Sequence, residues 1–86
     1  MSEKERFEMI VKICERAEGL GCKVSRQTLL MDLQSADKKF NLRLEDFLAA
    51  DDFNFMHDVL GIVSNIVRDK WPSDDFGFFV PRFAKN

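Results

Sequence analysis

The chain has 86 residues, of which 45% are hydrophobic and 33% charged, with a formal net charge of −2 at pH 7. This length supports one small domain, residues 1–86, and the apolar content argues against a disordered chain. An acidic chain lacks the positive field behind most non-specific nucleic-acid binding, so nucleic acid is not the expected partner. Met1–Arg6 is charged, and no apolar run approaches the roughly 20 residues of a membrane span, so neither secretion nor membrane insertion is expected.

The two cysteines, Cys14 and Cys22, form no CxxC motif, and the charged stretch Met1–Arg6 leads us to expect no signal peptide. Disulfides are rare in reducing compartments, so we expect both thiols to be reduced in a cytoplasmic protein. Cys14 falls on the apolar side of a predicted helix, where a thiol usually behaves as a small hydrophobic side chain.

The first predicted helix runs from about Glu3 to Glu18. Ser2 can cap its start, and acidic residues in the first turn suit the positive end of the helix dipole. Gly19 and Gly21 favour its termination. Helical spacing places one set of apolar residues on the same side, as expected for a surface helix that faces a core: Phe7, Ile10, Val11, Ile13, Cys14 and Ala17.

A second helix is predicted over Arg26–Phe40, with Ser25 as its N-cap and Met31 on the side away from its apolar face. The apolar face consists of Leu29, Leu30, Leu33, Ala36 and Phe40. Asn41 is then expected to open a short third helix, Leu42–Ala50. Three of its residues are spaced to pack inward: Leu44, Phe47 and Leu48.

The stretch Asp52–Arg68 predicts a central helix, capped by Asp51 or Asp52. At about 100° per residue, its apolar residues fill half of the helical wheel: Phe53, Phe55, Met56, Val59, Leu60, Ile62, Val63, Ile66 and Val67. The polar half holds Asn54, His57, Asp58, Gly61, Ser64, Asn65 and Arg68. So wide an apolar face needs neighbours on several sides, and the other helices are expected to cover it.

Trp71-Pro72 ends regular helix, because the residue before a proline is pushed toward extended conformations. Phe76–Phe83 is aromatic but has no helical register, and Pro81 lacks the N–H that a sheet ladder needs. We therefore expect an extended tail. The predicted fold is all-α: a compact bundle of about four helices with an extended aromatic C-terminal tail packed on it.

Several segments carry a recognisable pattern. Leu44–Phe55, His57-Asp58-Val59, Gly61-Ile62 and Phe79–Ala84 follow L-x-A-D-D-F-x-F-x-H-D-V-x-G-I, then a helix, then F-x-P-R-F-A. This pattern resembles a family of small uncharacterised proteins from phages, prophages and mobile elements, and it covers about Thr28–Ala84. The resemblance implies a bacterial or phage accessory protein of the cytoplasm, and it implies no particular activity.

A stripe along the central helix is the first candidate surface for binding a partner. His57, Gly61, Ser64 and Arg68 are spaced at i, i+4, i+7 and i+11, at the border of the apolar face. Gly61 costs the helix about 1 kcal/mol relative to Ala, which is explained if another backbone or a ligand approaches closely there. The simpler interpretation, which we favour, is that the C-terminal tail packs on Gly61 and that His57 is hydrogen-bonded within the fold.

The aromatic tail is the second candidate. Phe79, Arg82 and Phe83 could form an exposed patch that binds another protein or a second copy of the chain, since Arg beside an aromatic ring is common at interfaces. The alternative is that most of these rings pack within the molecule. Either candidate surface predicts a protein that works by protein–protein interaction.

Residues for catalysis or metal binding are few. His57 and Asp58 are adjacent in a helix and should point about 100° apart, which excludes a paired acid and base. Asp51, Asp52 and Asp58 could join His57 around a metal ion, but one histidine without matching cysteine or histidine spacing is a poor ligand set. We therefore expect no enzyme, no catalytic residue, no metal and no cofactor.

The alternative function is a small DNA-binding regulator. Gly21–Leu29 resembles the turn and recognition helix of helix-turn-helix proteins, in which Ser25, Arg26, Gln27 and Thr28 would face the groove. The acidic charge balance and the loose connection before Ser25 favour an accessory protein that binds another protein, or itself, over this alternative.

Overall fold

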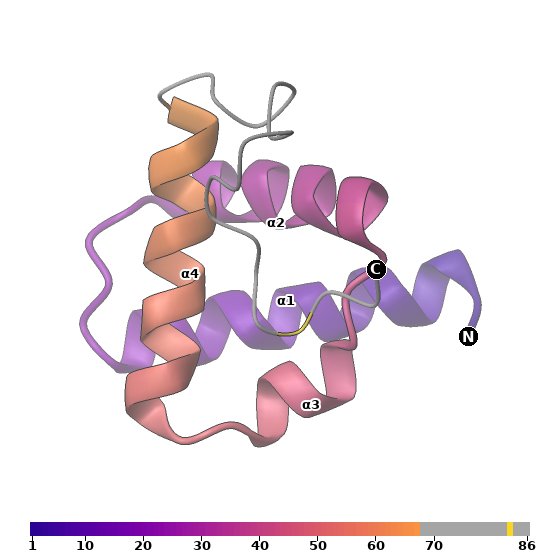
Figure 1. Cartoon of the computed structure of the whole chain (residues 1–86), viewed down its shortest axis with the longest axis horizontal. Helices are drawn as coiled ribbons and strands as arrows, with labels where there is room; N and C mark the ends of the chain where they lie inside the picture. The colour runs from indigo at the N-terminus through magenta and orange to yellow at the C-terminus, as the bar shows by residue number, and fades with distance from the viewer. Residues whose placement is uncertain (68–82, 84–86) are drawn as a thin grey trace.

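Four helices make up most of the chain that the computed structural model describes, which is residues 1–67 and 83 without the side chains of residues 65–67. They are α1 (Glu3–Gly19), α2 (Arg26–Phe40), α3 (Leu44–Ala49) and α4 (Asp52–Val67). α1 packs on α2 and α3, and α2 packs on α4. In Figure 1, α1 and α2 run in opposite directions and α4 runs across them. The predicted all-α fold is confirmed.

The first helix begins where the sequence predicts. The Ser2 hydroxyl accepts a hydrogen bond from the Glu5 backbone N–H at 3.1 Å, and the Glu5 carboxylate accepts one from the Ser2 N–H at 3.1 Å. This reciprocal pair satisfies two backbone donors that the helix itself cannot. α1 continues through Gly19, and Gly21, with a φ of 93°, makes the left-handed turn that leads away from it.

The second helix has the predicted bounds. The Ser25 hydroxyl accepts a hydrogen bond from the Thr28 N–H at 3.2 Å and caps its start. At the other end Asn41 adopts a φ of 52°, the left-handed conformation that closes many helices, and its N–H donates to the Asp37 carbonyl at 2.7 Å. Asn41 therefore ends α2, and the prediction that it opens the third helix is wrong.

The third helix is shorter than predicted because the backbone before it bonds elsewhere. The Leu42 N–H donates to the Asp37 carboxylate at 3.0 Å, and the Arg43 N–H donates to the Phe83 carbonyl at 2.7 Å. Phe83 is 40 positions further along the chain, so this contact is invisible to local sequence patterns.

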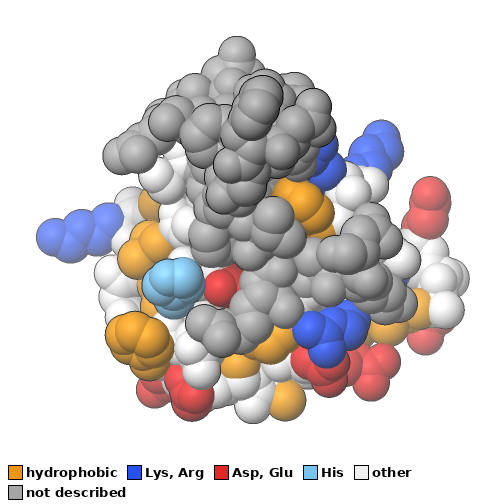
Figure 2. All heavy atoms as spheres, in the orientation of Figure 1, with side chains coloured by type: hydrophobic (Ala, Val, Ile, Leu, Met, Phe, Trp, Pro, Cys, Tyr) orange, Lys and Arg blue, Asp and Glu red, His pale blue; other side chains and the backbone are white. Residues whose placement is uncertain are grey.

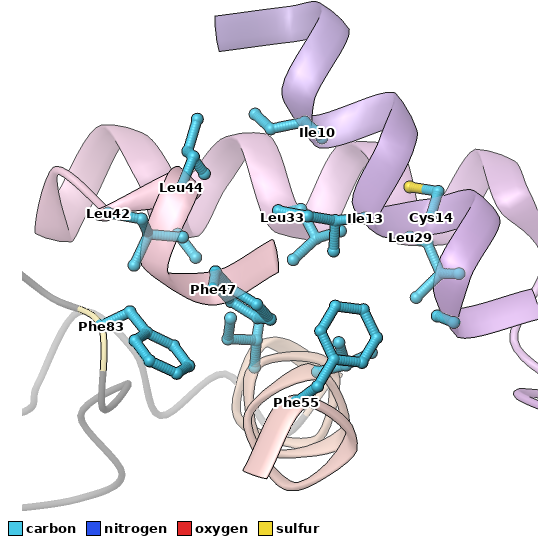
Figure 3. Close-up of a cluster of buried hydrophobic side chains, with 14 of the residues drawn as sticks. Ile10, Ile13, Cys14, Leu29, Leu33, Leu42, Leu44, Phe47, Phe55 and Phe83 are labelled. Atoms are coloured by element: carbon cyan, nitrogen blue, oxygen red, sulfur yellow. The ribbon is translucent and has the colours of Figure 1, made fainter. Parts of the chain in front are cut away.

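The core combines side chains from all four helices with one ring from the tail (Figure 3). The Phe47 ring centroid lies 5.3 Å from that of Phe55 and 5.0 Å from that of Phe83. Phe83 is 8% exposed, so the docking expected for the tail holds at this residue. The remaining predicted tail, 76–82, lies outside the described residues. The buried apolar residues are Ile10, Ile13, Cys14, Ala17, Leu29, Leu33, Ala36, Phe40, Leu42, Leu44, Phe47, Phe55, Val59, Ile62 and Phe83.

The predicted faces of the helices need correction. Phe53 is 77% exposed and Leu60 is 50% exposed, although both were placed on the inner face of α4. Asp58, placed on the polar side, is 1% exposed. On the helical wheel of α4, the buried Phe55 side chain marks the direction of the core. At 100° per residue, Asp58 lies only about 60° around the wheel from Phe55, whereas Phe53 and Leu60 lie about 140–160° from it. On α1, Phe7 is likewise partly exposed instead of buried.

Candidate functional site

The start of α4 is held by an arginine from α1. The Arg16 guanidinium donates to the Leu48 carbonyl at 2.8 Å, to the Ala50 carbonyl at 2.7 Å and to the Asp52 carboxylate at 2.9 Å. It also lies 4.3 Å from the centre of the Phe55 ring, where a cation is attracted to the aromatic face. These contacts satisfy carbonyls at the end of α3 and fix the direction in which α4 leaves it.

The N-cap of α4 is one of the two residues that the sequence predicts. The Asp51 carboxylate accepts a hydrogen bond from the Asn54 N–H at 2.8 Å and another from the Asn54 side-chain amide at 2.9 Å. A carboxylate here also interacts favourably with the positive end of the helix dipole. The first turn of α4 is therefore anchored by hydrogen bonds at its N-terminus.

Three exposed residues follow one side of α4, and we call them the α4 stripe: Phe53, His57 and Leu60. They are spaced at i, i+4 and i+7. The His57 ring stacks on the Phe53 ring with centroids 6.2 Å apart and an interplanar angle of 24°. Figure 2 shows the single histidine of the chain at the surface with hydrophobic side chains beside it. Two apolar side chains and an imidazole are thus presented together to solvent.

The histidine is oriented by the buried carboxylate next to it. His57 Nδ1 lies 3.3 Å from Asp58 Oδ1. A carboxylate at this position favours the tautomer with a proton on Nδ1 and fixes the ring orientation. The sequence argument that these side chains cannot meet is wrong, because rotation about their side-chain bonds spans the angle between adjacent Cβ atoms.

The predicted partner-binding residues differ in their exposure and in whether the structure describes them. Gly61 and Ser64 are partly buried, while His57 belongs to the α4 stripe. Arg68, Phe79 and Arg82 lie outside the described residues. Phe83 is buried against Phe47, so its ring contributes to the core and is not part of an exposed patch.

Three of the four predicted DNA-facing residues, Ser25, Arg26 and Thr28, already form hydrogen bonds within the protein. Arg26 donates to the two carboxylate oxygens of Glu18 at 2.6 and 3.0 Å. These hydrogen bonds lower the pKa of Glu18 and raise the pKa of Arg26. The Ser25 hydroxyl caps α2 and donates to the Thr28 hydroxyl at 3.0 Å, while Gln27 is exposed. A phosphate would have to compete with Glu18 for Arg26.

Two further findings concern the described residues only. Residues 1–67 and 83 contain no group of three or more His, Cys, Asp or Glu side chains arranged to hold a metal ion. Within the same part of the chain, no helix combines the length and the apolar character needed to cross a membrane.

A comparison with known proteins identifies the family. A family model described as a family of unknown function (DUF6874) matches residues 5–85. The chain belongs to this family. The match begins at Glu5 and so includes α1, whereas the motif resemblance left the first helix outside. No curated protein and no solved structure matches the chain.

Two of the three residues in the α4 stripe, Phe53 and Leu60, were not predicted to be exposed. Phe53 and Leu60 were assigned to the core because the apolar half of the wheel was treated as one continuous inner face. Their angular distance from Phe55 was the signal that could have separated them, provided that the direction of the core was known. That direction follows from the contact of α4 with α2.

Proposed function

We propose that this protein is a small accessory protein of phage or mobile-element type that acts by binding another protein through the α4 stripe. The exposure of Phe53, at 77%, together with that of Leu60 on the same side of the helix, carries this proposal. The resemblance of its sequence pattern to small phage and mobile-element proteins supports the setting.

Exposed apolar side chains gain free energy when a partner removes them from water, at about 25 cal/mol per Å². A single exposed ring is ordinary on a protein surface, but two apolar residues in register on one helix present a contact that a partner can cover. The fixed first turn of α4 lowers the entropy that binding would cost. His57 adds a polar group between the two apolar side chains, which gives the contact a specific orientation.

The test is affinity capture from an extract of the organism that encodes the protein. The Phe53→Ser/Leu60→Ser double variant is expected to lose at least one protein that the wild type captures. Leu20→Ser is the matched control, because Leu20 is also exposed, at 38%, but lies in the connection after α1. If the double variant keeps its fold and captures every protein that the wild type captures, the α4 stripe is not the binding surface.

The alternative function makes the opposite prediction. A DNA-binding regulator would bind a random-sequence duplex at low salt and lose that binding steeply as salt is added, because phosphate contacts release counterions. Fluorescence anisotropy with a labelled duplex measures this directly. The proposed function predicts no binding even at low salt.

A further inference from the structure

A second exposed apolar surface lies between the N-terminal half of α1 and the C-terminal half of α2. The two helices border a groove of about 800 Å³. Phe7, which is 44% exposed, lines one wall, and Met31, which is 61% exposed, lines the other. A methionine side chain adapts to the shape of an inserted group, so these walls suit an aromatic ring.

The groove also contains a fixed polar pair. Arg6 and Asp37 form a two-point ion pair, and Arg6 also donates to the Leu42 carbonyl at 2.8 Å. Their side chains are 20% and 14% exposed, and both residues line the groove. This pair connects α1 to α2 at the groove.

The remaining charges of the groove are mainly positive. Lys4 and Lys38 both line it, and neither forms an ion pair within the part of the chain that the structure describes. Glu3 is the other charged lining residue, which leaves an excess of one positive charge after the Arg6–Asp37 pair is set aside. The groove therefore suits an apolar group that carries negative charge beside it.

The first turn of α4 presents an apolar side chain with negative charge beside it. Among the described residues, Phe53 is the most exposed of the large hydrophobic side chains, and the sequence neighbours before it are Asp51 and Asp52. The Asp52 side chain is 72% exposed even though one of its oxygens pairs with Arg16. An aromatic ring and a carboxylate are thus presented together at this end of the protein.

The groove and the first turn of α4 cannot meet within one molecule. Figure 1 shows the groove-forming ends of α1 and α2 at the right and the start of α4 at the lower left, along the longest axis of the molecule. The molecule extends 32 Å along this axis. Each copy therefore offers one groove and one protruding ring, in different directions.

We propose that a second copy of this chain inserts Phe53 into the groove between Phe7 and Met31, with its Asp52 close to Lys4 and Lys38. The contact joins two different surfaces, so it is heterologous and continues from copy to copy into a ring or an open chain. This inference rests on the proposed function, because it uses Phe53 of the α4 stripe and names a second copy as the partner. One inserted ring covers less area than a standard stable interface of about 1,200–2,000 Å², so the association is weak, with a dissociation constant of about 10–1,000 μM.

Sedimentation equilibrium on four forms of the full chain, up to about 1 mM protein, tests the contact. The wild type is expected to increase in average mass with concentration. Phe53→Ser removes the inserted ring and Met31→Glu places a negative charge in the groove, so each variant alone stays monomeric. An equimolar mixture of the two variants forms a complex of two copies and no larger, because one has an intact groove and the other an intact ring. Gln27→Glu, an equally charged change at an exposed site on α2, associates like the wild type.

Other results overturn the inference. A monomeric wild type at the highest concentration excludes self-association, while the proposed function still stands if the double variant of the α4 stripe loses a captured protein. If Met31→Glu still associates, the contact does not use the groove. If Phe53→Ser still associates, it does not use the ring, and a mixture that stays monomeric excludes the head-to-tail arrangement. Far-UV circular dichroism confirms that each variant keeps the helical fold.

Discussion

Replacing Asp32 with leucine should stabilise this protein at neutral pH. Asp32 lies on α2, is 7% exposed, and its Oδ2 has no hydrogen-bond partner among the described residues. A buried polar group without a partner costs about 1–3 kcal/mol. Leucine also has a better helix propensity than aspartate, by about 0.5 kcal/mol. Its greater bulk costs about 1 kcal/mol if the site is tightly packed.

The net gain expected for Asp32→Leu is therefore about 1–2 kcal/mol in the free energy of unfolding. For a domain of this size, each kcal/mol raises the melting temperature by about 4–8 °C. Urea denaturation followed by far-UV circular dichroism measures the free energy, and thermal denaturation gives the independent check. Asp32→Asn is the matched variant, because it keeps the shape of the side chain and removes only the ionisable group.

The gain should also depend on pH. Burial raises the pKa of Asp32, so the folded protein binds this proton more tightly than the unfolded chain does. The stability from protonation is fully present below the unfolded pKa of about 3.9 and is lost as the pH rises through the folded pKa. The advantage of both variants should thus be largest at about pH 7 and smaller at about pH 4. The reasoning is refuted if Asp32→Leu is less stable than the wild type while Asp32→Asn matches the wild type at both pH values.

Three further changes test other parts of the fold. Asp37→Ala should lower the free energy of unfolding by about 2 kcal/mol, because it leaves the partly buried Arg6 guanidinium without its carboxylate; an unchanged urea midpoint would contradict this. Phe47→Ala should lower the free energy of unfolding by about 3–5 kcal/mol, because it opens a cavity at the centre of the aromatic cluster. Urea denaturation measures this loss, and a loss below about 1 kcal/mol would show that neighbouring side chains fill the cavity. Burial raises the pKa of Cys14 to about 11, so iodoacetamide should modify Cys22 first in the native protein. The Cys22→Ser variant should therefore resist labelling. Rapid modification of this variant would be inconsistent with a buried Cys14 thiol.

Much of the secondary structure could be predicted because short-range contacts determine it. Ser2, Ser25 and Asp51 each cap a helix by accepting a hydrogen bond from a backbone N–H three residues later. Such contacts depend only on residue type and spacing, so the sequence contains all the information needed to place them. The amphipathic face of α1 and the exposure of Met31 follow from helical spacing in the same way, but Phe7, on the predicted apolar face, is 44% exposed.

The candidate surface depended on contacts between distant segments. The matching family has no assigned function, so the candidate surface is defined by the tertiary structure alone. Whether Phe53 faces the core or the solvent depends on where α2 lies against α4, and Arg16 from α1 fixes the start of that helix. The Phe83 ring, which the sequence offered as a partner-binding group, packs against Phe47 and is 8% exposed.

The sequence by itself determined which of the described segments are helical, where most of them start, and that the fold is all-α. Only the tertiary structure decided that Phe53 and Leu60 face solvent, that Asp32 and Asp58 are buried, and that Asn41 closes a helix. The physical reason is the separation along the sequence of the residues that interact. Caps and helical periodicity act over a few residues, whereas the direction of the core is set by helices that meet from distant parts of the chain.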